Sequence, residues 1–430
     1  MGEIKQRDYM FDTFRGILML SIPMSHFTKM SGNLYSELYL GGGFPQATFG
    51  GFIYITINVF VMQAFMFLSG YFSKKPDRAR ETAFKTFMWP YLVFTVIYFG
   101  VRYFFFGNAH LDFLSPPFAL WFLFALFFYR FFLKDMVKLK WLLTLSLVMF
   151  LVAGQVSEFG DYLALGRVFS YFPFFLLGFY CSRERLAWVR QLKKKPAILV
   201  VMGIVLAGIS VLLCMYGPNV GWYLLRESVD NVPRMAWYED TLLRIALFFI
   251  SSGWIIFMVN ILPSKQGILA YVGTNTMPVY VFHLTLRYVI QFYGLYIGFI
   301  SCLAVCWFGI LSLIHKKVQN TAIYIAAIAV SAAGMYFLFS SGCLSSLYGL
   351  CPENRLFYYL LVYGGALIAG FSFVTPFWIK LYDILVDGPA KLPAITKWLK
   401  GPGYKEDEVR TPWCKSSGKG FENRKGLHFF

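Results

Sequence analysis

Apolar runs of about twenty residues recur along the chain, separated by short polar or charged segments. A run of this length spans the hydrocarbon core of a bilayer as a helix. Twelve runs are predicted, or eleven if the weak division at Gly294 is ignored. They cover residues 11–29, 52–73, 86–106, 118–133, 141–156, 168–182, 196–216, 241–262, 272–294, 296–314, 321–341 and 357–379. The pattern therefore predicts an all-α polytopic integral membrane protein.

The composition agrees with a chain folded in lipid. Hydrophobic residues make up 58% of the sequence and charged residues only 14%, whereas soluble domains carry about 25% charged residues. The first apolar run follows a short charged stretch and lacks a small-residue cleavage site. We therefore expect it to remain as a membrane helix and not to act as a cleavable signal peptide.

The distribution of Lys and Arg predicts the orientation, because cytoplasmic segments retain positive charge. With the N-terminus inside, 29 of the 39 Lys and Arg residues fall in inner segments and 5 in outer ones. Both termini are therefore predicted to be cytoplasmic. The net charge of +17 is explained by topology and contact with anionic lipids, and no nucleic-acid partner is expected.

Two polar residues interrupt the first span. Arg15 and His26 lie eleven residues apart, which places them on nearly the same helix face about 16 Å apart. An ionisable residue within a membrane helix indicates a pathway or an active site by default. The simpler alternative is that each residue, being close to a helix end, reaches the interfacial region without any function.

Two further polar groups have the same ambiguity. His283 and Arg287 lie four residues apart on one helical face, which suits either site residues or a polar contact between helices. A basic segment follows Ser69 and suits either phosphate binding or the positive-inside rule alone. Its cations are Lys74, Lys75, Arg78 and Arg80.

The remaining features are less specific. The spacing of Cys and His predicts no metal site. Cys343 and Cys351 lie in one predicted outer loop, where they form either a disulfide or two free thiols. The loop 217–240 carries Trp222 and Trp237 beside acidic residues, which suits a sugar platform or an ordinary membrane interface equally. We predict a transmembrane core at residues 1–314, two added helices at 315–380 and a basic cytoplasmic tail at 381–430.

Several segments in order along the chain resemble the membrane acyltransferase 3 family, particularly its fucose 4-O-acetylase-like branch. The most specific match is an Arg followed eleven positions later by His, with an Asp three residues before the Arg: Asp12, Arg15 and His26. Thr276 departs from the family pattern, which commonly has Ser there. The matching segments are RDYMFDTFRG at residues 7–16, FLSGYF at 67–72, WPY at 89–91, LWFL at 120–123, YFPFFLLG at 171–178 and GTNTMPVYVFH at 273–283.

The resemblance implies transfer of an acyl group from cytoplasmic acyl-CoA, usually acetyl-CoA, to a hydroxyl of a glycan or lipid-linked sugar at the outer face of a bacterial cytoplasmic membrane. A neutral histidine suits removal of the hydroxyl proton, so His26 is the candidate base, with an acyl-histidine intermediate as an open alternative. Arg15 either binds the CoA diphosphate or holds Asp12. The CoA-binding candidates are Arg15, Ser69, Lys74, Lys75, Arg78 and Arg80, and the oxyanion-donor candidates are Trp121, His283 and Arg287.

Two other classes fit the same spans. A secondary transporter with both termini inside would also place Arg and His residues within the membrane. The first six spans differ from the last six in charge and motif, which weakens the two-half architecture common among carriers. A scaffold that retains the acyltransferase sequence would bind no CoA.

Overall fold

The computed structural model describes residues 8–30, 49–107, 109–159, 162–218, 221–226, 228, 230, 235–340 and 355–390. Every regular element in these ranges is a helix. The longer helices are α1 (Met10–Met30), α3 (Phe49–Tyr71), α4 (Pro76–Ala83), α5 (Trp89–Phe106), α6 (Trp121–Met136), α7 (Leu142–Val152), α8 (Leu165–Tyr180), α9 (Arg183–Val189), α10 (Pro196–Tyr216), α11 (Trp237–Ile261), α12 (Ile268–Thr274), α13 (Thr276–Tyr293), α14 (Leu295–Val318), α15 (Thr321–Ser340), α16 (Arg355–Ser372) and α17 (Pro376–Ala390).

Short helical turns join these elements. A π-helical turn, η1 (Phe84–Met88), connects α4 to α5. The others are 3₁₀ turns: η2 (Phe118–Leu120), η3 (Ser157–Phe159), η4 (Tyr162–Ala164), η5 (Arg190–Lys194) and η6 (Trp222–Leu224).

Six of the described helical stretches are long and apolar enough to cross a bilayer, or seven if the bent pair formed by Tyr358–Ser372 and Pro376–Ala390 is one span. This supports a membrane protein, and the twelve spans remain a prediction. Helices α1 and α13 are not among the six. Both carry charged and imidazole side chains, which reduce the mean hydropathy of a helix.

The described residues fall into two compact units. The first unit contains α1, α12 to α16, the start of α3 and the first part of α17, as far as Tyr382. The second unit contains the remainder of α3, α4 to α11 and the end of α17.

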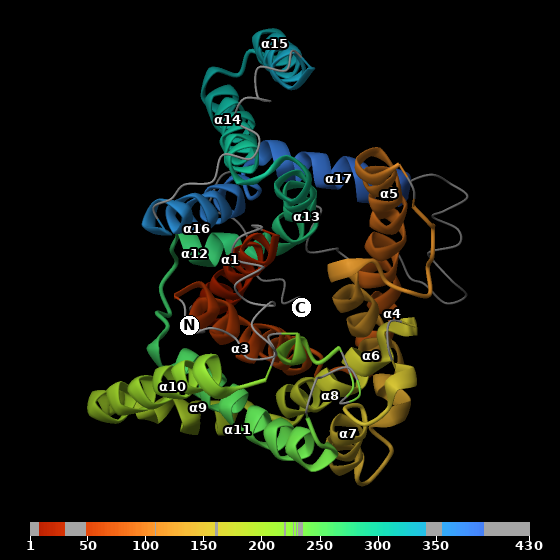
Figure 1. The fold of residues 1–430 in the computed structure, drawn as a ribbon, viewed down its shortest axis with the longest axis vertical. Helices are drawn as coiled ribbons and strands as arrows, with labels where there is room; N and C mark the ends of the chain where they lie inside the picture. The colour runs from red at the N-terminus through yellow and green to blue at the C-terminus, as the bar shows by residue number, and fades with distance from the viewer. Residues whose placement is uncertain are drawn as a thin grey trace, which may run out of the picture. The chain divides into compact units, whose positions relative to one another are not determined.

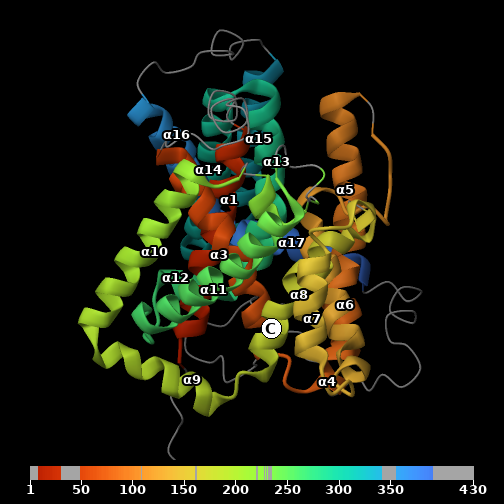
Figure 2. The same ribbon diagram turned by 60° about the horizontal axis from the view of Figure 1, so that its bottom comes forward.

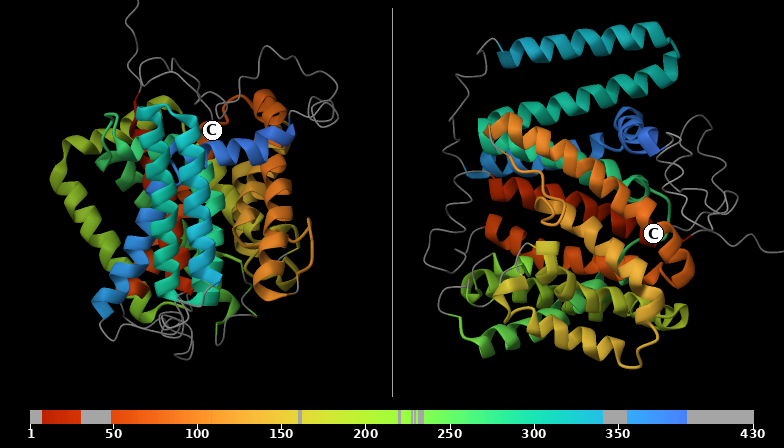
Figure 3. Two further views of the ribbon diagram at one scale, coloured as in Figure 1. Left: turned by 90° about the horizontal axis from the view of Figure 1, so that it is seen from above. Right: turned by 90° about the vertical axis from the view of Figure 1, so that its right-hand side faces the viewer.

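In the first unit, α1 packs against α12, α13 and α16 (Figure 1), and α14 packs against α13 and α16. Helix α15 lies alongside α14, as Figure 3 shows. Helix α13 is buried on nearly all sides along its length. Pro278 is its third residue, where the backbone N–H would have no intrahelical acceptor, so the proline leaves the helix intact.

Two glycines set the crossing of α1 and α12. A Cβ built on Gly16 would overlap the carbonyl oxygen of Leu269, and a Cβ built on Gly273 would overlap the carbonyl oxygen of Asp12. Only glycine permits this backbone-to-backbone approach, as at small-residue interfaces between membrane helices. The two glycines belong to two separate segments of the family pattern, so that pattern encodes a packing contact here.

The second unit contains a similar close crossing of two helices at glycines. Its helices α6, α7 and α8 lie side by side, with α4 against α6 (Figure 2). A Cβ on Gly70 of α3 would overlap the carbonyl oxygen of Phe175, and a Cβ on Gly178 of α8 would overlap the carbonyl oxygen of Phe67. Gly70 and Gly178 also lie in two of the segments that resemble the family, 67–72 and 171–178.

Candidate active site

A pair of histidines lies where α1 meets α13 in the first unit. The ring centroids of His26 and His283 are 5.2 Å apart and the ring planes are inclined by only 15°. His26 is half-buried, whereas His283 is fully buried. The structure therefore joins the histidine that the sequence proposed as a base to one that it proposed as a supporting residue.

The tautomer of His283 follows from its backbone contact. Its Nδ1 lies 2.9 Å from the carbonyl oxygen of Val279. A carbonyl oxygen can only accept, so Nδ1 carries the proton and donates it, and Nε2 of the neutral ring holds a lone pair. That Nε2 atom is buried with no hydrogen-bond partner among the described residues. A neutral His283 in this tautomer cannot donate a hydrogen bond to an oxyanion.

Arg15 forms an ion pair with Asp12 one helical turn earlier. Both side chains are buried, with 10% and 3% of their surface exposed. A buried arginine requires a compensating negative charge, and Asp12 supplies one. Of the two roles considered for Arg15 from the sequence, the geometry favours the contact with Asp12.

Arg287 supplies a second buried cation in the first unit. It lies one helical turn beyond His283, and its charge acts on that imidazole. Its guanidinium carbon lies 5.0 Å from the ring centroid of Tyr288, a distance typical of a cation–π contact. Among the three candidate oxyanion donors, Arg287 is a permanent cation beside the histidine pair.

Helix α16, which lies beyond the segments that resemble the family, also contacts this region. The hydroxyl of Thr28 lies 3.2 Å from the hydroxyl of Tyr363, and Thr28 follows His26 by two residues. No sequence pattern singles out Tyr363, because this contact depends on the packing of α16 against α1.

Lys74 of the basic segment caps α8 in the second unit. Its ammonium group donates to the carbonyl oxygens of Gly178 at 2.9 Å, Cys181 at 2.7 Å and Phe179. These carbonyls lie at a helix C-terminus, where a cation is favourable. Burial lowers the pKa of Lys74. Its observed role is therefore structural.

Two neighbouring cations are also engaged with protein groups. Arg80 forms an ion pair with Asp135 and donates through Nε to the carbonyl oxygen of Phe131 at 2.7 Å. Lys134 pairs with Asp77 at 2.6 Å. These ion pairs compensate the charges of Arg80 and Lys134. The positive charge available to an external anion is therefore smaller than the count of Lys and Arg residues indicates.

The other predicted residues near this segment differ in exposure. Lys75 is exposed and Arg78 is half-buried. Ser69 is buried, and its hydroxyl has no hydrogen-bond partner within the part of the chain that the structure describes. Its backbone carbonyl accepts from the hydroxyl of Ser73 at 2.8 Å.

Trp121, also in the second unit, lies between a cation and an aromatic ring. The guanidinium carbon of Arg167 is 4.8 Å from its ring centroid, and the ring of Tyr171 is 5.0 Å away, centroid to centroid. These contacts give Trp121 a packing role at the start of α6.

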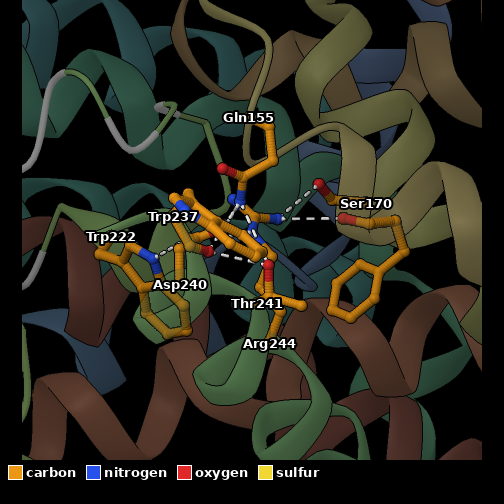
Figure 4. A network of polar contacts seen from close by, with 8 residues as sticks. Gln155, Ser170, Trp222, Trp237, Asp240, Thr241 and Arg244 are labelled. Carbon is orange, nitrogen blue, oxygen red and sulfur yellow. Dashed lines mark hydrogen bonds and ion pairs between the residues drawn. The ribbon is translucent and has the colours of Figure 1, made fainter. Parts of the chain in front are cut away.

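A buried ionic network that the sequence did not reveal lies between α7, α8 and α11 (Figure 4). Asp240 and Arg244 are completely buried, and Arg244 Nε lies 2.9 Å from Asp240 Oδ2. Trp222 Nε1 and Gln155 Nε2 donate to the Asp240 carboxylate at 2.6 and 2.8 Å, and Arg244 Nη1 donates to Ser170 Oγ at 3.2 Å. Every charge in the network is compensated, which indicates a structural role.

This network changes the interpretation of the outer loop. Trp222 is 2% exposed and its indole N–H is bound to Asp240, so it offers no platform for a sugar. Trp237 is 67% exposed and keeps that capacity. Cys343, Cys351 and the tail 391–430 lie outside the described residues.

A cavity of about 310 Å³ lies at the C-terminal end of α5 in the second unit. Its polar lining consists of Thr95, Arg102, His110, Asp112 and Ser115. The hydrogen bonds that Asp112 accepts from the chain at its own loop lower the pKa of its carboxyl group. The volume of the cavity falls at the lower end of the range for small-molecule sites, ~300–1,000 Å³.

The geometry describes a membrane protein with histidines and arginines buried among its helices. The family model for the acyltransferase 3 proteins, described as an acyltransferase domain, matches residues 8–340. The chain therefore belongs to this family of membrane acyltransferases. Comparison with curated proteins and with solved structures gave no significant match.

Proposed function

We propose that the protein is an O-acyltransferase that moves an acyl group from acyl-CoA to a hydroxyl of a glycan or lipid-linked sugar. The supporting observation is the stacking of His26 on His283 in a chain that belongs to an acyltransferase family. Of the two rings, only His26 is partly exposed, so His26 is the base that an acceptor hydroxyl can approach.

The chemistry requires one proton to move. His26 takes the proton of the acceptor hydroxyl as its oxygen attacks the thioester carbonyl carbon. Collapse of the tetrahedral intermediate breaks the bond between carbon and sulfur, and the imidazolium returns the proton to the departing thiolate. The products are an ester and CoA thiol, and His26 ends neutral.

The intermediate carries a negative charge on oxygen, which buried donors stabilise. We assign this role to Arg287, because His283 in the tautomer inferred from its Val279 contact has no donor left. His283 is then a positioning residue, which holds the ring of His26 by stacking. Asp12 compensates Arg15 on the same helix and keeps the buried arginine in one orientation.

The donor end requires cations for the CoA phosphates. We assign the phosphates to the basic segment at Lys75 and Arg78, in which Lys74 caps α8 and Arg80 pairs with Asp135. The resemblance to the fucose 4-O-acetylase-like branch favours acetyl-CoA as the donor.

The cavity at the end of α5 is our candidate for acceptor binding. Hydroxyl, carboxylate and guanidinium groups line it, and such groups suit a hydroxylated ligand. The positive-inside count predicts that the loop after α5 lies on the outer side, where the acceptor is expected.

One assay tests the enzymatic proposal against transport. Purified protein in detergent is incubated with labelled acetyl-CoA and a panel of sugars, and ester product and free thiol are measured. We expect equal amounts of both. Flux of a sugar into protein-containing vesicles without any thioester, together with no ester product, would instead support a transporter.

A further inference from the structure

Helix α16 (Arg355–Ser372) lies beyond residues 8–340, which the family model matches. It packs along α1, the helix that carries His26. Gly370 of α16 faces the side chain of Leu20, because a Cβ built on that glycine would lie 2.5 Å from a methyl carbon of Leu20. Tyr363, two helical turns earlier in α16, contacts Thr28 in the last turn of α1. A helix outside the family match therefore supports the helix of the proposed base.

The last turn of α1 depends on such support because of a proline. Pro23 lies inside α1 and has no N–H, so the carbonyl of Met19 loses the donor that an ordinary residue would supply four positions later. This break in the backbone hydrogen bonds comes three residues before His26. The orientation of the turn that follows is therefore determined more by contacts with neighbouring helices than by the helix itself.

Two contacts hold this turn from nearly opposite sides. His26 stacks on His283 of α13, with the ring centroids 5.2 Å apart. Thr28 follows His26 by two residues, which places it about 200° around the helix, and its hydroxyl oxygen lies 3.2 Å from that of Tyr363. Helices α13 and α16 both pack against α1, so the two contacts together fix the rotation of the turn that carries His26.

The hydrogen bond between the two hydroxyls has a definite direction. Thr28 gives its single hydroxyl proton to the carbonyl oxygen of Met24 at 2.8 Å, because a carbonyl oxygen can only accept. The hydroxyl of Tyr363 then donates to the oxygen of Thr28. Both side chains are buried, where loss of a hydrogen-bond partner is costly. The contact therefore keeps Thr28 against α16.

A second tyrosine of α16 provides an internal comparison. Tyr359 lies one helical turn before Tyr363, and the two rings stack with their centroids 6.0 Å apart. The hydroxyl of Tyr359 accepts from the backbone N–H of Gly50 at 3.3 Å, at the start of α3. The two tyrosines thus carry the same group on the same helix but connect it to different helices, α3 and α1.

We propose that Tyr363 is a positioning residue for His26. Its hydrogen bond to Thr28 holds the last turn of α1 in the rotation at which the imidazole of His26 stacks on His283. The effect of Tyr363 on turnover rests on the proposed function, whereas its effect on the orientation of His26 does not.

The test uses the full-length protein in detergent and two measurements. One is the steady-state turnover of acetyl-CoA and acceptor sugar. The other is the rate at which diethyl pyrocarbonate modifies His26, followed by mass spectrometry of the peptide that contains it, and this measurement needs no substrate. The variants are Tyr363→Phe, Thr28→Val and the two combined. Tyr359→Phe is the matched control, because it removes the same group from the same helix.

We expect kcat to fall about tenfold in Tyr363→Phe and in Thr28→Val, with an unchanged KM for acyl-CoA, because a displaced base transfers the proton less efficiently. The modification rate of His26 should rise about two- to tenfold, the factor that corresponds to the loss of one neutral hydrogen bond. The combined variant should match the single variants, because both remove the same contact. Tyr359→Phe should behave as the native protein does in both measurements.

Thr28→Val keeps the test decisive if Tyr363→Phe fails to fold. A native modification rate of His26 in the folded variants would overturn the positioning role whatever their turnover, because turnover alone can fall through lost stability. An equal rise in Tyr359→Phe would also overturn it, since the effect would then come from a general loosening of α16. If the native protein forms no ester, the proposed function fails, and the modification rates still decide whether Tyr363 orients His26.

Discussion

The imidazole rings of His26 and His283 stack on each other although they come from α1 and α13. If His283 positions His26 by this contact, a phenyl ring in place of the His283 imidazole should still position His26. We predict that His283→Ala lowers kcat about 10- to 100-fold with an unchanged KM for acyl-CoA, and that His283→Phe retains most activity. Steady-state kinetics with both substrates varied measure this. A His283→Phe protein that folds but is as inactive as His26→Ala would show that the Nε2 lone pair takes part directly.

The glycine crossing of α1 and α12 predicts a sharp steric effect. Gly16→Ala and Gly273→Ala should each destabilise the protein by about 1–3 kcal/mol or more, because a Cβ overlaps a backbone carbonyl that cannot move freely. Thermal unfolding in detergent measures the effect. Gly100→Ala and Gly208→Ala are matched controls, since a Cβ at either position meets open space. Equal melting temperatures for all four variants would contradict the crossing.

The Asp240–Arg244 pair predicts a non-additive result. Asp240→Asn should cost about 3–5 kcal/mol, because it leaves Arg244 buried without its counter-charge. The double variant Asp240→Leu with Arg244→Met removes both charges and should be more stable than Asp240→Asn alone. The exposed pair of Asp77 and Lys134 is the control, and Asp77→Asn should change the melting temperature little. A double variant less stable than Asp240→Asn would refute a purely structural network.

The proposed function divides the basic segment after α3 into a structural and a binding part. Lys74→Met should lower the melting temperature, because three carbonyls of the α8 terminus lose their donor, while the KM for acyl-CoA of the folded fraction stays the same. Arg78→Gln should raise that KM about tenfold with little change in melting temperature. Kinetics and melting curves of the two variants measured side by side test this division, and the reverse pattern would contradict it.

The sequence predicted an all-helical membrane protein, and it singled out Asp12, Arg15 and His26 as candidate residues of the first unit. Long apolar runs specify membrane helices whatever their tertiary contacts, and Asp12, Arg15 and His26 stand out because a charged or imidazole group is costly in lipid. The stacking of His26 on His283 was not predictable, because helix spacing fixes which residues share one face and does not fix which helices meet.

Other parts could not be read from the sequence for specific reasons. The contacts of Lys74 with the end of α8 could not be predicted, because backbone carbonyls carry no sequence signal. The sequence pattern places Asp240 at the end of a predicted loop, and it does not indicate the buried pair with Arg244 one helical turn later. The apolar run at 272–294 is divided by the break between α12 and α13 at Asn275.

The most direct measurement of the central claim is the turnover of labelled acetyl-CoA and acceptor sugar by native protein and by His26→Ala, each first shown to bind CoA. We predict that His26→Ala binds CoA with native affinity and forms no ester above the background, because the base that removes the hydroxyl proton is gone. Ester formation by His26→Ala at a rate close to that of the native protein would contradict the assignment.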